Sequence, residues 1–152
     1  MNVRSRFLTP VVVGAAFAAG VWAGTARPEL GAATAALTPV FTPYSDVVGG
    51  KWMKVAPGVS IAGISHTASV DFGVIQISSV GKHTHHNSTE YAYVVSGTGT
   101  GTLGGKSVAV KPGDLVVIPP NVEHSFAASG APFRFVMTVM PPIAAGDMHM
   151  MK

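Results

Sequence analysis

The chain contains no cysteine, so no disulfide can hold it together and no cysteine is available to carry a lipid anchor. Charged residues are also scarce, at 11% of the 152 residues, whereas apolar residues make up 47%. This length is enough for one domain with a real core, and the core alone must stabilise the fold. No long helical period is visible, and 18 glycines and 11 prolines favour many turns over long helices.

The N-terminal segment has the pattern of a targeting sequence. Arg4 and Arg6 precede an uncharged run from residue 7 to 25 that is rich in alanine, valine and glycine, and small residues near 21–26 suit a cleavage site. Residues 1–26 are therefore predicted to be a secretory signal peptide, so that the mature chain is exported to the periplasm or secreted. The alternatives are an uncleaved membrane anchor, since the run approaches the roughly 20 residues that span a bilayer, or a hydrophobic helix of the fold.

The positive charge of the chain does not point to a nucleic-acid partner. The whole sequence has 10 basic and 7 acidic residues, and loss of Arg4 and Arg6 leaves 8 basic against 7 acidic residues. No cluster of lysine or arginine remains, and no nucleic-acid motif is present. The mature chain is predicted to bind neither nucleic acid nor, once the signal is removed, the membrane.

The rest of the chain divides into three parts. Residues 27–50 show no clear period and are predicted to be a linker or N-terminal arm, and residues 143–152 are predicted to be a frayed C-terminal tail. Between them, residues 51–142 form the predicted domain, with short candidate strands at 59–64, 70–78, 82–85, 90–95, 98–103, 106–110, 115–118, 124–127 and 133–140. Such a series of short strands predicts an all-β fold, either an antiparallel β-barrel or a two-sheet jelly roll.

Turn residues separate these strands. Gly104 and Gly105 form a two-residue hairpin connection, in which both residues are expected to have positive φ. Lys-Pro-Gly-Asp at 111–114 predicts a second tight turn.

Four residues in two segments predict a metal site. His83 and His85 are two apart, so on an extended strand both imidazoles point to the same face and can bind one ion. A polar turn then precedes Glu90, which can bring its carboxylate back beside them, and His124 follows a strand and a Pro-Pro-Asn turn. His86 lies next to His85 but points to the opposite side, and is not expected to be a ligand.

This ligand set suits a divalent transition metal, namely Fe, Mn, Ni, Cu or Zn. An octahedral ion held by four protein ligands keeps two positions for water, oxygen or substrate, whereas a tetrahedral zinc would be closed. The same residues therefore allow either catalysis or a structural ion. Three neutral imidazoles and one carboxylate leave a formal charge of +1, which suits a Lewis acid or an oxygen-activating centre.

At these residues the chain resembles the cupin family. The first cupin motif is His-x-His, three or four residues, Glu, six residues and Gly, and His83, His85, Glu90 and Gly97 have that spacing. Gly81 lies closer to the histidine pair than the leading glycine of the family usually does. The resemblance covers about residues 55 to 142 and implies a small antiparallel β-barrel, the double-stranded β-helix or jelly roll of the cupins.

The second cupin motif is also present, with two replacements. Gly113, Pro119 and His124 are in register with it, while Asn121 stands at a glycine position and Ala128 at an asparagine position. Asparagine tolerates the left-handed backbone, so the turn is expected to form. Neither replacement affects a predicted ligand.

The resemblance also implies a range of functions. Similar cupins with three histidines and one glutamate include dioxygenases, oxalate-acting enzymes and germin-like proteins, and other small cupins are isomerases, lyases or sugar-binding proteins. We expect an exported, metal-dependent oxidoreductase of dioxygenase type that acts on a small organic substrate. The alternatives are a non-catalytic cupin that binds a sugar or metal complex, and a cupin lyase or isomerase. Cupins often pair through sheet edges, which suggests a homodimer.

Several other side chains allow two interpretations. His66 is expected to be exposed, and His149, in the Met-rich tail, either binds copper or lies in a frayed terminus. Arg134 either grips a substrate carboxylate or is an ordinary surface charge. Gln76 either hydrogen-bonds a ligand in the cavity or faces water, and Tyr91 and Tyr93 lie on the face opposite Glu90, in packing or an oligomer interface.

Overall fold

A computed structural model describes residues 39–151. The predicted signal peptide and the first part of the predicted arm, residues 27–38, lie outside the described residues. Within the described part, no helix is long and apolar enough to cross a membrane.

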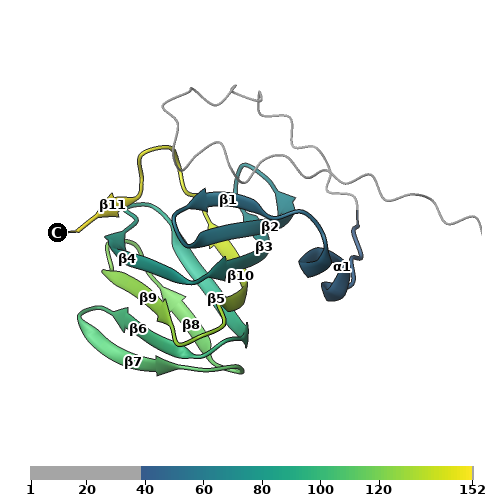
Figure 1. Ribbon diagram of the computed structural model, residues 1–152. Helices are drawn as coiled ribbons and strands as arrows, with labels where there is room; N and C mark the ends of the chain where they lie inside the picture. The colour runs from purple at the N-terminus through teal and green to yellow at the C-terminus, as the bar shows by residue number, and fades with distance from the viewer. Residues whose placement is uncertain (1–38, 152) are drawn as a thin grey trace, which may run out of the picture.

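The regular secondary structure of the described chain is almost all β-strand (Figure 1). The elements in chain order are α1 (Tyr44–Gly49), β1 (Met53–Ala56), β2 (Val59–His66), β3 (Asp71–Ile77), β4 (Ser79–Thr84), β5 (Thr89–Ser96), β6 (Gly99–Leu103), β7 (Lys106–Val110), β8 (Leu115–Ile118), β9 (His124–Ala128), β10 (Phe133–Met140) and β11 (His149–Met150).

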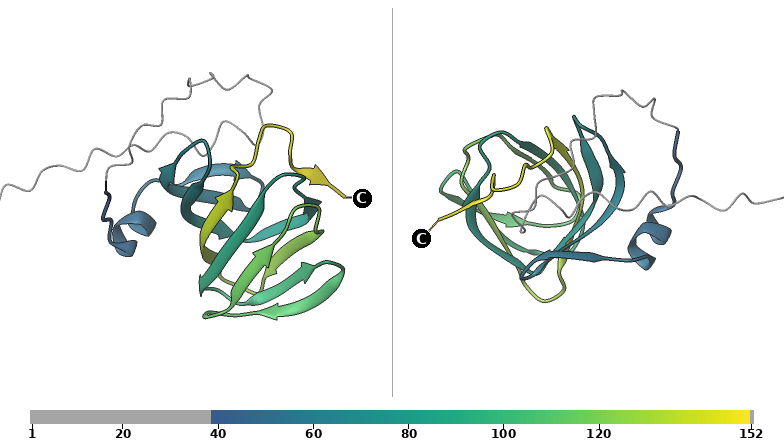
Figure 2. Two further views of the ribbon diagram at one scale, coloured as in Figure 1. Left: turned by 180° about the vertical axis from the view of Figure 1, so that it is seen from behind. Right: turned by 90° about the horizontal axis from the view of Figure 1, so that it is seen from above.

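These strands form two sheets, and every pairing in them is antiparallel. One sheet has the order β1-β2-β3-β10-β5-β8 and the other the order β11-β4-β9-β6-β7. The view from above in Figure 2 shows the two sheets curving around a common interior. The sheets are not joined into one closed ladder, so the all-β prediction is confirmed in its jelly-roll form.

The turn chemistry read from the sequence is present. Gly104 and Gly105 both have positive φ, of 55° and 77°, and connect β6 to β7 directly. Asn121 also has a positive φ, 64°, and its backbone N–H donates to the carbonyl of His85 at 2.7 Å. Asparagine thus replaces glycine without loss of the turn, and this turn fastens the segment that follows β8 to the histidine segment of β4.

The core fills one end of the space between the sheets. Phe133 and Phe135 of β10 are 0% and 2% exposed, and their rings pack against Phe126 of β9 with centroid separations of 6.2 and 5.3 Å. Val94 of β5 is fully buried in the same cluster. Because these side chains occupy one end of the interior, the polar residues that the strands also turn inward collect at the other end.

Two segments outside the predicted strands are more ordered than expected. Part of the predicted arm forms the short helix α1, whose first turn closes with the N–H groups of Asp46 and Val47 donating to the carbonyl of Pro43. The predicted frayed tail is wrong, because its end forms β11, which pairs with β4 (His149 opposite Thr84, Met150 opposite His83). The reason is that β4 would otherwise be an unpaired sheet edge.

Candidate metal centre

Backbone register places His83 and His124 directly opposite each other. His83 of β4 pairs with His124, the first residue of β9, so both side chains project from the same face into the interior. Their ring centroids are 4.0 Å apart, and both residues are buried, at 5% and 2% exposure. A cross-strand pair therefore forms the base of the candidate site.

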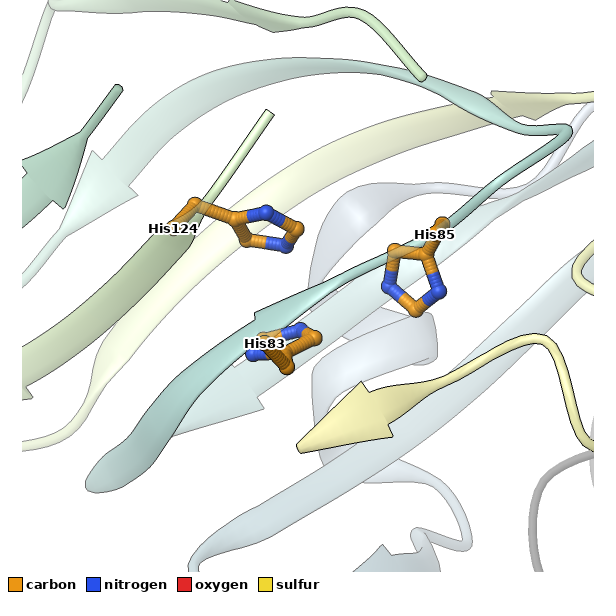
Figure 3. A group of neighbouring side chains, drawn as sticks. All are labelled: His83, His85 and His124. Carbon is orange, nitrogen blue, oxygen red and sulfur yellow. The ribbon is translucent and has the colours of Figure 1, made fainter. Parts of the chain in front are cut away.

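His85 completes the triad from just beyond the end of β4. It lies two residues after His83 and turns to the same face, as the alternation of an extended chain requires. Figure 3 shows the three imidazoles facing a common space, and one ligand atom from each lies within 4.8 Å of the others. Two nitrogens bound to one ion at 2.0–2.1 Å lie at most about 4.2 Å apart, so small side-chain movements would let the triad share an ion.

Glu90, at the start of β5, brings a carboxylate to the edge of the triad. Its Oε1 lies 3.6 Å from Nε2 of His85, and its Oε2 lies 3.4 Å from Nε2 of His124. All four predicted ligands are thus brought together from three strands and a turn. Their role as metal ligands stays a prediction.

The outer ring nitrogens of the triad are all engaged by backbone carbonyls. Nδ1 of His83 donates to Gly81 O at 2.8 Å, Nδ1 of His85 to Asp147 O at 2.9 Å, and Nδ1 of His124 to Val122 O at 2.9 Å. A carbonyl can only accept, so these contacts place the proton on Nδ1 and leave the Nε2 lone pair of a neutral ring facing the site. This orientation of the ring is the one that a metal-binding imidazole needs.

One of these inward nitrogens makes no hydrogen bond. Nε2 of His124 is buried and has no hydrogen-bond partner within the described residues, although Oε2 of Glu90 lies 3.4 Å away. A buried polar atom without a partner is costly, which calls for a ligand at that position. The donor set and this atom therefore fit a bound divalent ion.

Burial and the close packing of charges shift the pKa values of the site. Burial, reinforced by His124, lowers the pKa of His83 to about 4, and burial also lowers the pKa of His85 against the opposing effect of Glu90. Burial would raise the pKa of Glu90, but the contact with His124 and the other imidazoles hold it below its usual value. For His124, burial would lower the pKa, but the close contact and charge of Glu90 together with the Val122 carbonyl raise it. An ion would thus meet the neutral imidazoles of His83 and His85 and the ionised carboxylate of Glu90, which attracts cations.

The metal-free protein is expected to lose stability as the pH falls from about 6.5 to about 4. Over this range unfolded His83 binds a proton that the folded residue does not, so stability rises with pH across it. The difference between 6.5 and about 4 corresponds to roughly 3 kcal/mol for His83. The lowered pKa of His85 acts in the same direction, and the raised pKa of His124 acts in the opposite one. Urea unfolding of chelator-treated protein between pH 4 and pH 7 measures the slope. A His83→Gln variant should flatten it, and an unchanged slope in that variant would contradict the assignment.

The candidate site opens on an apolar cavity of about 110 Å³ between the two sheets. Its walls include Ile75, Met137 and Ile118 from the six-stranded sheet, together with Ile143 and Met148 from the C-terminal segment. Among the described residues that line it, the polar side chains are Asp71 and the four predicted ligands. A small, largely apolar ligand with a few polar groups fits such a space.

Asp147 is a site residue that the sequence did not reveal. Besides its carbonyl contact to His85, its carboxylate is 6% exposed and accepts the backbone N–H groups of His86 (2.8 Å) and Asn87 (3.3 Å). The C-terminal segment therefore binds and orders the turn at His85 to Asn87. His86 itself points away from the triad and stacks on His149, with ring centroids 3.9 Å apart.

His66 and Asp71 form a second polar feature at the cavity. The Nδ1 of His66 is in hydrogen-bond contact with Oδ1 of Asp71, and the two residues pair across β2 and β3. Asp71 is 5% exposed, whereas the side chain of His66 keeps 25% of its surface in solvent. The expectation that His66 is simply exposed is therefore wrong, because its ring turns toward a buried carboxylate.

Other polar candidates lie on the outside of the six-stranded sheet. Arg134 donates from Nε to Gln76 Oε1 at 3.2 Å, and its guanidinium lies 5.9 Å from the centroid of the Trp52 ring. Neither Arg134 nor Gln76 lines the cavity, so the surface interpretation holds for both. Tyr91 and Tyr93 are 43% and 47% exposed, on the face opposite Glu90 as alternation predicts.

Comparison with known proteins agrees with this architecture. Residues 74–139 match a family described as "Cupin domain". A 71-residue stretch is 31% identical to the uncharacterised protein MJ1618 of Methanocaldococcus jannaschii, covering 46% of this chain and 57% of that protein. The match thus spans little more than half of that relative's length.

Solved structures share the fold at low sequence identity. KdgF from Halomonas sp. superposes with a TM-score of 0.59 at 22% identity, covering 68% of this chain and 94% of that one. Pac13 of Streptomyces, a nucleoside dehydratase, has a TM-score of 0.60 at 20% identity, with 76% and 92% covered. A predicted oxalate decarboxylase from Thermotoga maritima has a TM-score of 0.51 at 21% identity, with 60% and 90% covered. The motif spacing, the family match and the jelly-roll architecture agree, and residues 74–139 form a cupin domain.

Proposed function

We propose that this cupin is a metal-dependent enzyme that acts on a small organic substrate in its apolar cavity. His83, His85, His124 and Glu90 would hold one divalent transition ion. The observation that carries the proposal is the set of three Nδ1 contacts to carbonyls, which turns three Nε2 atoms toward one buried space and leaves that of His124 without a hydrogen bond.

The reaction that we propose first is an oxidation of dioxygenase type. When bound, an ion with this ligand set would supply Lewis acidity or oxygen activation, with positions left open for substrate and oxygen. The chain itself would contribute an apolar wall and a buried carboxylate, Glu90, beside the reacting centre. Exclusion of water strengthens electrostatic interactions inside such a cavity.

A lyase or isomerase reaction is the second candidate, and Asp71 is the observation that favours it. A carboxylate in the cavity, separate from the predicted ligands, can accept a proton from a substrate without being tied to the ion. The similar folds of a nucleoside dehydratase and a predicted oxalate decarboxylase are compatible with chemistry of this kind.

We also propose that the mature chain is exported and forms a homodimer. The predicted signal peptide supports export. Leu115 and Val117 of β8, at the edge of the six-stranded sheet, are 80% and 57% exposed beside Tyr91 and Tyr93, which supports self-association of this face. A monomeric mass by light scattering would argue against the dimer.

Metal analysis followed by turnover assays tests the proposed function. The exported form, purified without an affinity tag, is expected to carry close to one transition ion per chain by elemental mass spectrometry. Oxygen consumption with a panel of small hydroxy acids, diols and phenols would then support the dioxygenase, whereas conversion without oxygen uptake would support the lyase or isomerase. Failure to bind any of the five candidate ions after incubation would overturn the proposal and leave a ligand-binding cupin.

A further inference from the structure

A β-bulge aims His66 at the cavity wall. Along β2 and β3 the register is regular from Val59 opposite Ile77 to Gly63 opposite Gly73, and it then shifts by one residue. Without this shift Ser65 would lie opposite Asp71, whereas the bulge puts His66 there. Bulges re-aim side chains in this way, and they are over-represented next to active sites.

The same sheet places Asp71 in one row with a predicted metal ligand. Asp71 pairs with Val139 of β10, and Val139 pairs with Glu90 of β5. Directly paired residues project to the same face, so Asp71 and Glu90 both turn inward. They are two strands apart, which separates their backbones by about 10 Å. Both side chains line the same cavity of about 110 Å³.

The cavity therefore has two polar ends on otherwise apolar walls. One end consists of the four predicted metal ligands, and the other is Asp71, held by His66. Met137, in the adjacent row, and Val139 supply apolar surface between the two ends. The contact with the His66 imidazole fixes the Asp71 carboxylate, whose side chain is 7% exposed against 25% for that of His66.

We propose that Asp71, positioned by His66, is a substrate anchor that accepts a hydrogen bond from a hydroxyl or amino group. The substrate class is then a small molecule with an oxygen ligand for the ion at one end, such as a carboxylate, and a hydrogen-bond donor a few carbons away. This inference rests on the proposed function, since the first of the two ends is the metal centre. A buried acceptor discriminates strongly against an analogue that lacks the donor.

Matched ligand pairs test the anchor. Straight-chain carboxylic acids of three to six carbons, each with and without a terminal hydroxyl group, are titrated calorimetrically into the metal-loaded wild-type protein. At the chain length that spans the cavity, the hydroxy acid is expected to bind roughly tenfold more tightly than the plain acid. Asp71→Ala should abolish this preference, Asp71→Asn should keep a smaller part of it, and His66→Ala should reduce it. The affinity for the plain acid should stay within about threefold of wild type in every variant.

Controls separate the anchor from the metal centre. Ser65→Ala, next to His66 in the bulge, should leave the preference unchanged, and circular dichroism and metal content are measured on each variant. The anchor alone would be overturned if the metal-loaded wild-type protein showed no preference for the hydroxy acid at any chain length. This holds whether the two acids of each pair bind equally or neither binds. Loss of the ion in the Asp71→Asn variant would also overturn the anchor, because it would show that Asp71 belongs to the metal centre. A wild-type protein that takes up no ion would overturn the proposed function and the anchor with it.

Discussion

The Glu90→Ala/His124→Ala double variant is expected to purify without the ion that the wild-type chain carries. Both side chains face the buried triad, and Glu90 contacts His124 at 3.4 Å and His85 at 3.6 Å, so the substitutions remove half of the ligand set. Protein zinc sites with four ligands are worth about 10–16 kcal/mol in total, or roughly 3 kcal/mol per ligand. Loss of two ligands therefore corresponds to an affinity at least about ten-thousandfold lower.

Elemental mass spectrometry and competition with a chromogenic chelator measure this loss. The matched control is a His86→Ala/His149→Ala variant, which also removes two titratable groups but leaves the triad intact. Both side chains lie outside the triad and form, with Asp147, a second group of possible ligands, so this variant also tests whether that group holds the ion. The control should keep the wild-type metal content. Equal metal content in both double variants would place the ion elsewhere and refute the assignment of the four ligands.

Asp147→Ala is expected to weaken metal binding by about 10-fold to 100-fold, the range seen when a group that orients a ligand is removed. The Asp147 carboxylate holds the backbone N–H groups of His86 and Asn87, and its carbonyl receives the Nδ1 proton of His85. Without the carboxylate the turn and the C-terminal segment separate, and the orientation of the His85 imidazole is no longer fixed.

Two further variants make this second prediction specific. Asp147→Asn keeps an acceptor oxygen for the turn and should lie between wild type and Asp147→Ala. Removal of residues 144–152 takes away both the carboxylate and the carbonyl, and should reduce the affinity at least as much as Asp147→Ala. Wild-type affinity in the truncated chain, measured by chelator competition, would show that the C-terminal segment has no part in the site.

The features that the sequence determined are those that depend on residues close together in the chain. The strands over 106–110, 115–118 and 133–140 are as predicted, since alternation and turn residues act within a few positions. The positive φ of Gly104, Gly105 and Asn121 follows from local backbone sterics. The spacing of His83 and His85 likewise put them on one face before any partner strand was known.

Tertiary structure decided everything that depends on pairing between distant segments. Asp147 reaches His85 across 62 residues, and no local pattern connects the two. The strands β1 and β11 were not predicted, because such short segments gain their order from the neighbours on which they pair. His66 looked exposed because regular alternation gives no sign of the bulge that turns it to Asp71. Local preferences set which elements form, but register and sheet packing decide which side chains share a cavity, since those depend on contacts that only the folded chain makes.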